Sequence, residues 1–287
     1  MQTQQLTYQF LNNTTFVMGN RKHAGKTTFL NWVLNQIRQV ESPAFGSIGV
    51  DGESHDQIDG RTKPRVYAHK GDGIVTSLAM IKKSDGLFSI EKALPINTPL
   101  GQLVIAKTLR GGRVELIGPE HNEQLQMVIK HLKDELQYKT IVFDGAASRL
   151  TPVSAVEQSG FYYVMNIDRR NLTKAVEQMQ LLTLSSQLKT MQAAEQLHPL
   201  EGALTKAKLS QLPKQCEGIL INDLSSVFLS YQQLAQLMKN SNIRVKQSIK
   251  LKGFVIITKD IALEAIKAML QSKNIQTKII YNPYVHQ

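Results

Sequence analysis

Short apolar segments rich in β-branched residues alternate with helical patterns along most of this 287-residue chain. Parallel strands need long crossover connections, which are usually helices, so this alternation predicts an α/β fold. We expect a doubly wound, mainly parallel sheet with helices on both faces. The predicted strands are 15–18, 47–50, 102–108, 113–117, 140–143, 161–165, 218–221, 253–258 and 278–281.

Between these strands, apolar residues recur three and four positions apart, the spacing of a helix with one buried face. The three clearest faces are Leu30, Val33, Leu34 and Ile37; Leu125, Val128, Ile129, Leu132 and Leu136; and Leu172, Val176 and Met179.

Two stretches interrupt the alternation. Residues 101–118 read as two strands joined by Arg110-Gly111-Gly112, which predicts an inserted hairpin. Residues 52–73 are polar, basic and rich in turn-forming residues, as functional loops often are. We expect a large domain over residues 1–215. A smaller α/β portion over 216–287 would either extend the first sheet or stand apart.

Composition narrows the class of protein. Lys and Arg outnumber Asp and Glu by 34 to 23, a net charge of +11, which suits an anionic partner or simply a solvated basic surface. Cys216 is the only cysteine, so neither an internal disulfide nor a cysteine metal cluster can form. The first residues do not resemble a signal peptide, and no apolar run approaches membrane-spanning length. We therefore expect a cytoplasmic protein without a membrane partner.

The strongest motif is the segment FVMGNRKHAGKTTFLNWVL at 16–34. A predicted strand leads into a glycine-containing loop, then Gly-Lys-Thr-Thr and a helix, the order of a phosphate-binding P-loop. The usual first glycine is replaced by Asn20, a residue that enters left-handed conformations readily. The predicted nucleotide contacts are Asn20, Arg21, Lys22, His23, Ala24, Gly25, Lys26, Thr27 and Thr28.

The residue types in this loop suggest separate roles. Gly25 permits close approach of the backbone, and Lys26 can reach the β- and γ-phosphates as a catalytic group. The Thr27 hydroxyl is a candidate Mg²⁺ ligand.

Two acidic segments support this interpretation. The apolar stretch 139–143 ends at Asp144, as in a Walker B strand, and Asp144 is a second candidate Mg²⁺ ligand. The predicted strand 47–50 ends before Asp51 and Glu53, and ligands bind beyond the carboxyl ends of strands in such sheets. We expect Asp51 to contribute to the metal site and Glu53 to position water. The sequence therefore predicts an ATP and Mg²⁺ site of the P-loop NTPase class.

Several stretches together resemble a specific family. GNRKHAGKTT, SIGVDGE, TPLGQLVIAKTL, VELIGP and FDGAASR, all within residues 19–149, are similar to the KamB-type subunit of lysine 5,6-aminomutase reactivase. The resemblance implies a P-loop protein that works with a MutS-like ATPase subunit on an adenosylcobalamin-dependent aminomutase. Nucleotide binding and hydrolysis would then drive exchange of the damaged cobalamin. No residue of this chain resembles a cobalamin ligand.

Other interpretations stay open. The loop also resembles that of metal-delivery GTPases, although the chain has no Asn-Lys-x-Asp motif and only one cysteine. Residues 166–169 and 258–260 are imperfect substitutes for the guanine motif. A nucleotide-gated binding module without turnover of its own is a second alternative. A nucleic-acid switch is the weakest, because no aromatic-rich basic stretch accompanies the positive charge.

Overall fold

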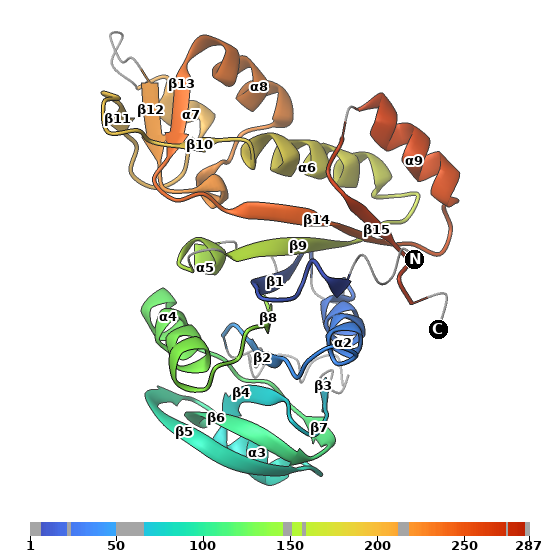
Figure 1. The fold of residues 1–287 in the computed structure, drawn as a ribbon. Coiled ribbons are helices and arrows are strands. Elements are labelled where there is room, and N and C mark those ends of the chain that lie inside the picture. The colour runs from blue at the N-terminus through green and yellow to red at the C-terminus, as the bar shows by residue number, and fades with distance from the viewer. Residues whose placement is uncertain are drawn as a thin grey trace. The chain divides into compact units, whose positions relative to one another are not determined.

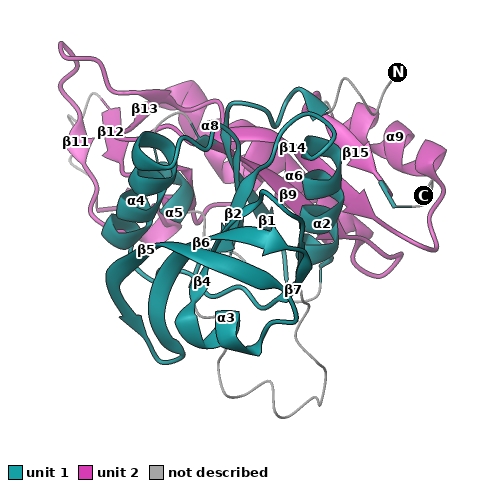
Figure 2. Ribbon diagram, turned by 60° about the horizontal axis from the view of Figure 1, so that its bottom comes forward, with its two compact units in different colours: residues 1–159, 283–287 teal, residues 160–282 magenta. Residues whose placement is uncertain are grey.

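The computed structural model describes residues 7–21, 24–49, 66–145, 151–156, 159–211, 218–273 and 275–284. The chain forms two compact units, coloured separately in Figure 2. Unit 1 comprises residues 1–159 together with 283–287, and unit 2 comprises residues 160–282. The domain boundary predicted at residues 215 and 216 lies inside unit 2.

Unit 1 is built on a mostly parallel sheet with the strand order β1-β8-β2-β4-β6-β5 (Figure 1). The parallel strands are β1 (Thr14–Gly19), β8 (Ile141–Asp144), β2 (Ala44–Ser47) and β4 (Gly73–Ser77). Two long antiparallel strands, β6 (Gly101–Arg110) and β5 (Leu87–Thr98), complete it. A separate antiparallel pair joins β3 (Val66–Ala68) to β7 (Gly112–Val114). The predicted α/β class with a mainly parallel sheet is confirmed.

Helices α2 (Lys26–Ile37) and α4 (Asn122–Lys130) lie on opposite sides of strands β1, β8 and β2 (Figures 1 and 2). The face of α2 predicted from the apolar spacing is buried, as Leu30, Val33, Leu34 and Ile37 are fully covered. A short π-helical turn, η2 (His131–Glu135), continues α4. The smaller helices of unit 1 are α3 (Leu78–Lys83) and α5 (Thr151–Ser154).

The centre of unit 1 is aromatic. Phe16 of β1 stacks on Phe143 of β8 with ring centroids 5.8 Å apart, and both side chains are fully buried. Phe29 of α2 stacks on Trp32 at 5.7 Å. Each buried side chain of this size contributes roughly 1.5–3 kcal/mol, so the first contact stabilises the β1–β8 pair and the second contributes to the buried face of α2.

The hairpin predicted at residues 101–118 is wrong. Strand β6 pairs antiparallel with β4 and with β5, whereas β7 pairs with β3. The hairpin turn lies before Gly101, which has a φ of 103° that favours glycine. Strand β5 escaped prediction because bulges interrupt its pairing with β6 and little of it is buried, so it lacks regular alternation.

Unit 2 contains two parallel sheets. Strands β9 (Ser159–Asn166), β14 (Lys250–Ile257) and β15 (Ile279–Tyr281) pair side by side, and β9 begins at the last residue of unit 1. The second sheet has the order β10-β13-β12-β11. Its strands are β10 (Lys189–Thr190), β13 (Asn242–Val245), β12 (Gly218–Ile221) and β11 (His198–Pro199).

The helices of unit 2 connect these strands. They are α6 (Leu172–Ser185), α7 (Lys206–Leu209), α8 (Tyr231–Asn240) and α9 (Leu263–Ser272), with a short 3-10 turn, η3 (Leu224–Ser226). Around the second sheet lies an apolar core that includes Leu188, Leu204, Ile219, Ile221, Leu234 and Ile243. Because β9 and β14 pair although they are distant in sequence, residues on both sides of position 215 belong to one unit.

An ion pair in unit 1 links the end of α2 to the segment before β4. The Arg38 side chain is 11% exposed and the Asp72 side chain 1%, and Arg38 Nη2 lies 2.6 Å from Asp72 Oδ2. The same carboxylate accepts the His69 amide at 2.8 Å, and Arg38 also donates to the Tyr67 carbonyl at 2.9 Å. Burial raises the pKa of Asp72 from its usual value, and the bonds from Arg38 and the His69 amide offset part of that rise.

Replacing Arg38 should therefore be costly. We expect Arg38→Met to lower the free energy of unfolding by about 3–5 kcal/mol at neutral pH, because it leaves the Asp72 carboxylate buried without its partner. Urea unfolding measures this loss, which should shrink in acid as Asp72 becomes protonated.

The matched control is Lys92→Met. Lys92 pairs with Glu135 at 3.0 Å, but both side chains are well exposed, at 40% and 49%, so the loss should be much smaller than for Arg38→Met. Equal losses in the two variants would contradict the assignment of Arg38 and Asp72 as a buried pair.

Candidate functional site

The candidate site lies where β1 ends and α2 begins, in unit 1. Gly19 is the last residue of β1, and Asn20 follows with its side-chain oxygen buried and without a hydrogen-bond partner among the described residues. Arg21 is exposed and Ala24 is fully buried. Lys22 and His23 lie outside the described residues. The sequence therefore turns from strand to helix within a short loop, as predicted.

Gly25 sets the direction of the helix. It is the N-cap of α2 and has φ 95° and ψ 17°, a left-handed conformation that glycine adopts without strain. Its carbonyl accepts the Phe29 amide at 2.9 Å, which closes the first helical turn. No side chain caps the helix. The first amides of α2, at Lys26, Thr27 and Thr28, have no intrahelical acceptor and are available to an anion at the positive end of the helix dipole.

The first turn of α2 is joined to the end of β8. The Thr27 hydroxyl donates to Asp144 Oδ2 at 2.9 Å, although 117 positions separate the two residues. Strand β8 pairs in parallel with β1, with Val17 opposite Asp144, so both strands end at the same edge. Asp144 is buried, with 8% of its surface exposed. The structure thus brings together Thr27 and Asp144, the two predicted metal ligands that it describes.

These two oxygens fit a magnesium site. Mg²⁺ binds oxygen ligands octahedrally at 2.0–2.1 Å, so adjacent ligands lie about 2.9 Å apart. That separation matches the distance between Thr27 Oγ1 and Asp144 Oδ2. A hydroxyl and a carboxylate are also the donor types that this hard cation prefers. Among the described residues, no group of three His, Cys, Asp or Glu side chains could hold a metal ion.

The remaining predicted acids cannot be placed. Asp51 and Glu53 lie outside the described residues. The strand before them is β2, which ends at Ser47 rather than at residue 50 as predicted. Gly49 follows with φ 77° and exchanges backbone bonds with the segment at Gly118 and Pro119, which ends the strand.

Sequence reasoning missed Ser47 and two glycines at this edge. Ser47 pairs with Asp144 in the β2–β8 register, and its buried hydroxyl has no hydrogen-bond partner among the described residues. A Cβ at Gly118 would lie 1.6 Å from the Ser47 carbonyl oxygen, and one at Gly145 would lie 2.0 Å from the Met18 sulfur. Backbone atoms therefore leave room only for glycine at position 118, whereas a side chain at position 145 would displace the Met18 side chain. The sequence shows Gly118 before a proline and Gly145 after Asp144, but it does not show which distant residues contact them in the folded chain.

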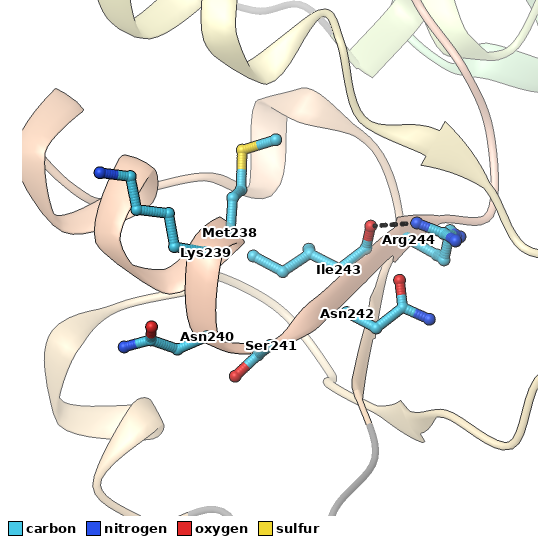
Figure 3. Close-up of a pocket in the computed structure, with 7 residues that line it drawn as sticks. All are labelled: Met238, Lys239, Asn240, Ser241, Asn242, Ile243 and Arg244. Carbon is cyan, nitrogen blue, oxygen red and sulfur yellow. Dashed lines mark hydrogen bonds between the residues drawn. The ribbon is translucent and has the colours of Figure 1, made fainter.

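Unit 2 has a separate, open depression of about 430 Å³ on its surface (Figure 3). It is lined by the end of α8 and the start of β13, at Met238, Lys239, Asn240, Ser241, Asn242, Ile243 and Arg244. Ligands of parallel sheets bind beyond the carboxyl ends of strands, whereas this depression adjoins the amino end of β13. Two of its polar side chains are also engaged, because Asn242 and Arg244 both donate to Glu195. We therefore do not assign it the functional site.

Comparison of the chain with protein-family models, curated proteins and solved structures gave no match. In the part of the chain that the structure describes, no helix is both long enough and apolar enough to cross a membrane. The assignment of a site therefore depends on the geometry of the loop, Thr27 and Asp144.

The ion pair beside the depression gives a prediction for acid stability. Arg244 Nη2 lies 2.7 Å from Glu195 Oε1. The bonds from the Gln192 amide, Asn242 and Arg244 lower the pKa of Glu195 to about 2. Because this folded-state pKa lies below the ordinary value of 4.5, the stabilisation is complete above pH 4.5 and is lost as the pH falls toward 2.

We therefore expect Glu195→Gln to unfold at lower urea concentration than the wild type at pH 6, with the difference shrinking between pH 4.5 and 2. Glu201→Gln is a control for surface charge, because Glu201 is exposed and its side chain forms no ion pair among the described residues. A difference for Glu195→Gln that does not change with pH would contradict the role of its carboxylate.

Proposed function

We propose that this chain binds a nucleoside triphosphate with Mg²⁺ at the loop between β1 and α2. The observation that carries the proposal is the Thr27–Asp144 hydrogen bond beside the left-handed Gly25. A hydroxyl at the start of a helix and a carboxylate at the end of the neighbouring strand are the Mg²⁺ ligands of a P-loop site. This supports assignment to the P-loop NTPase class.

Each residue has a role in this proposal. The amides at the start of α2 bind phosphate oxygens, and Lys26 pairs with the β- and γ-phosphates. Thr27 and Asp144 would hold Mg²⁺, which when bound neutralises part of the phosphate charge. The residues described at this site thus support the proposal of phosphate and metal binding. Asp51 is proposed to contribute to the metal site, and Glu53 to position water for hydrolysis.

ATP is the proposed nucleotide rather than GTP. A guanine-specific site needs a carboxylate that is available to the base, and the sequence has two imperfect matches to the guanine motif. The first contains Asp168, whose Oδ1 accepts the Arg170 and Asn171 amides at 2.9 Å. The second contains Asp260. This carboxylate already accepts the Thr258 hydroxyl at 3.2 Å and the Arg169 amide at 3.3 Å, both within unit 2. Its local engagement supports ATP.

The biological role follows from the resemblance to the KamB-type reactivase subunit. We propose that nucleotide binding by this chain, with a MutS-like ATPase partner, drives removal of damaged cobalamin from an adenosylcobalamin-dependent aminomutase. The Thr27–Asp144 contact at the carboxyl ends of the strands of unit 1 supports the nucleotide-binding part of this role. Gly118 belongs to the VELIGP stretch of the resemblance, and it packs on Ser47 at that edge.

Thermal unfolding with and without nucleotide tests the binding site. At 100 times its dissociation constant, Mg²⁺-ATP would stabilise the protein by about 2.7 kcal/mol, or roughly 5–10 °C for a domain of this size. We expect this shift with Mg²⁺-ATP, a smaller one with Mg²⁺-GTP, and none for Lys26→Ala. Thr27→Val should retain a shift with ATP but lose the additional shift caused by Mg²⁺.

Lys239→Ala is the matched control, because this exposed lysine lies on α8 in unit 2. It should give the full wild-type shift. Equal shifts in the wild type and Lys26→Ala, or no shift with any nucleotide, would exclude nucleotide binding at this loop.

The reactivase role has its own test. A cobalamin-dependent aminomutase is first inactivated by turnover, and then incubated with this chain, a MutS-like partner, Mg²⁺-ATP and fresh adenosylcobalamin. We expect activity to return with the wild type and not with Lys26→Ala. Recovery that is equal without this chain would exclude the role, while leaving the nucleotide site intact.

A further inference from the structure

The last described residues of the chain return to the candidate site. Pro283 and Tyr284 follow β15, yet they belong to unit 1, with the phosphate loop. The Tyr284 ring is largely buried, and this burial raises the pKa of its hydroxyl well above the usual range. A buried tyrosine hydroxyl needs a hydrogen-bond partner.

That partner is the phosphate loop itself. Tyr284 Oη lies 3.5 Å from the Gly25 carbonyl oxygen, 259 positions away in sequence. This is the carbonyl that also accepts the Phe29 amide at 2.9 Å. The bond from Tyr284 is long for an O–H···O contact, whose usual length is roughly 2.7–2.8 Å.

The position of this carbonyl matters because the peptide bond is planar. The Gly25 carbonyl and the Lys26 amide belong to one peptide unit and point in opposite directions. A donor that holds the carbonyl therefore fixes the direction of the Lys26 amide, one of the groups available to phosphate. A phosphate on that amide would in turn polarise the peptide and strengthen the bond from Tyr284.

We infer that Tyr284 is a positioning residue of the phosphate site, and that the segment after β15 is therefore part of nucleotide binding. The inference rests on the proposed function, because it assigns a further residue to the same site. Tyr284 acts through the Gly25–Lys26 peptide, and bound nucleotide tightens its hydrogen bond to the loop.

Calorimetric titration of the full-length chain with Mg²⁺-ATP and with Mg²⁺-ADP tests this inference. We expect Tyr284→Phe, which removes only the hydroxyl, to lower the affinity for both nucleotides about 3- to 10-fold, the usual effect of losing one neutral hydrogen bond. The unfolding temperature without nucleotide should stay close to that of the wild type. In hydrogen exchange, the amide of Lys26 should lose part of its nucleotide-induced protection.

Tyr281→Phe is the matched control. The Tyr281 hydroxyl donates to the Ile261 carbonyl at 2.9 Å within unit 2, so its loss should leave nucleotide affinity unchanged. A second variant that ends at Asn282 removes Tyr284 completely and should weaken binding at least as much as Tyr284→Phe.

The outcomes separate the two proposals. Wild-type affinity in Tyr284→Phe and in the shortened chain, with binding still abolished in Lys26→Ala, would overturn the role of Tyr284 alone. Equal weakening in Tyr281→Phe would also overturn it, by showing a general effect on the fold. Absence of binding by the wild type would instead overturn the proposed function.

Discussion

The parallel pairing of β1 with β8 is the interaction on which the candidate site depends. Its register sets Val17 opposite Asp144, and Thr27, in the first turn of α2, lies 2.9 Å from the carboxylate. The stacked rings of Phe16 and Phe143 lie in the same two strands and bury the pair completely. A slip of β8 by one residue would turn the Phe143 ring and the Asp144 carboxylate each to the opposite face of the sheet. Core packing and site geometry are therefore fixed together.

Close backbone approach is the second requirement of this edge. Gly25 must adopt a left-handed conformation, while Gly118 leaves no room for a side chain against the backbone of Ser47. Glycine is needed for dihedral freedom in the first case and for space in the second. A side chain at Gly118 would push apart the segments at this edge of the sheet, and so disturb the geometry of the candidate site.

The sequence predicted what depends on local pattern. The apolar spacing of Leu30, Val33, Leu34 and Ile37 identified the buried face of α2, and the strand–loop–helix order located the loop between β1 and α2. The predictions that were wrong concerned features set by the pairing of distant strands. The stretch 101–118 suggested a hairpin of its own, but β6 pairs with β4 and β5, and β7 pairs with β3. Strand β2 was predicted three residues late, because its end is set by the contact of Gly49 with the Gly118 segment.

By itself, the sequence determined the α/β class, the start of α2 and the residue types that can bind phosphate and Mg²⁺. These depend on hydrophobic period and on helix-end chemistry, which act over a few neighbouring residues. Only the tertiary structure decided that Asp144 meets Thr27, that Ser47 lies in register with Asp144, and that Tyr284 reaches Gly25. Such contacts join residues about 100 to 260 positions apart, and no local preference encodes which strand pairs with which.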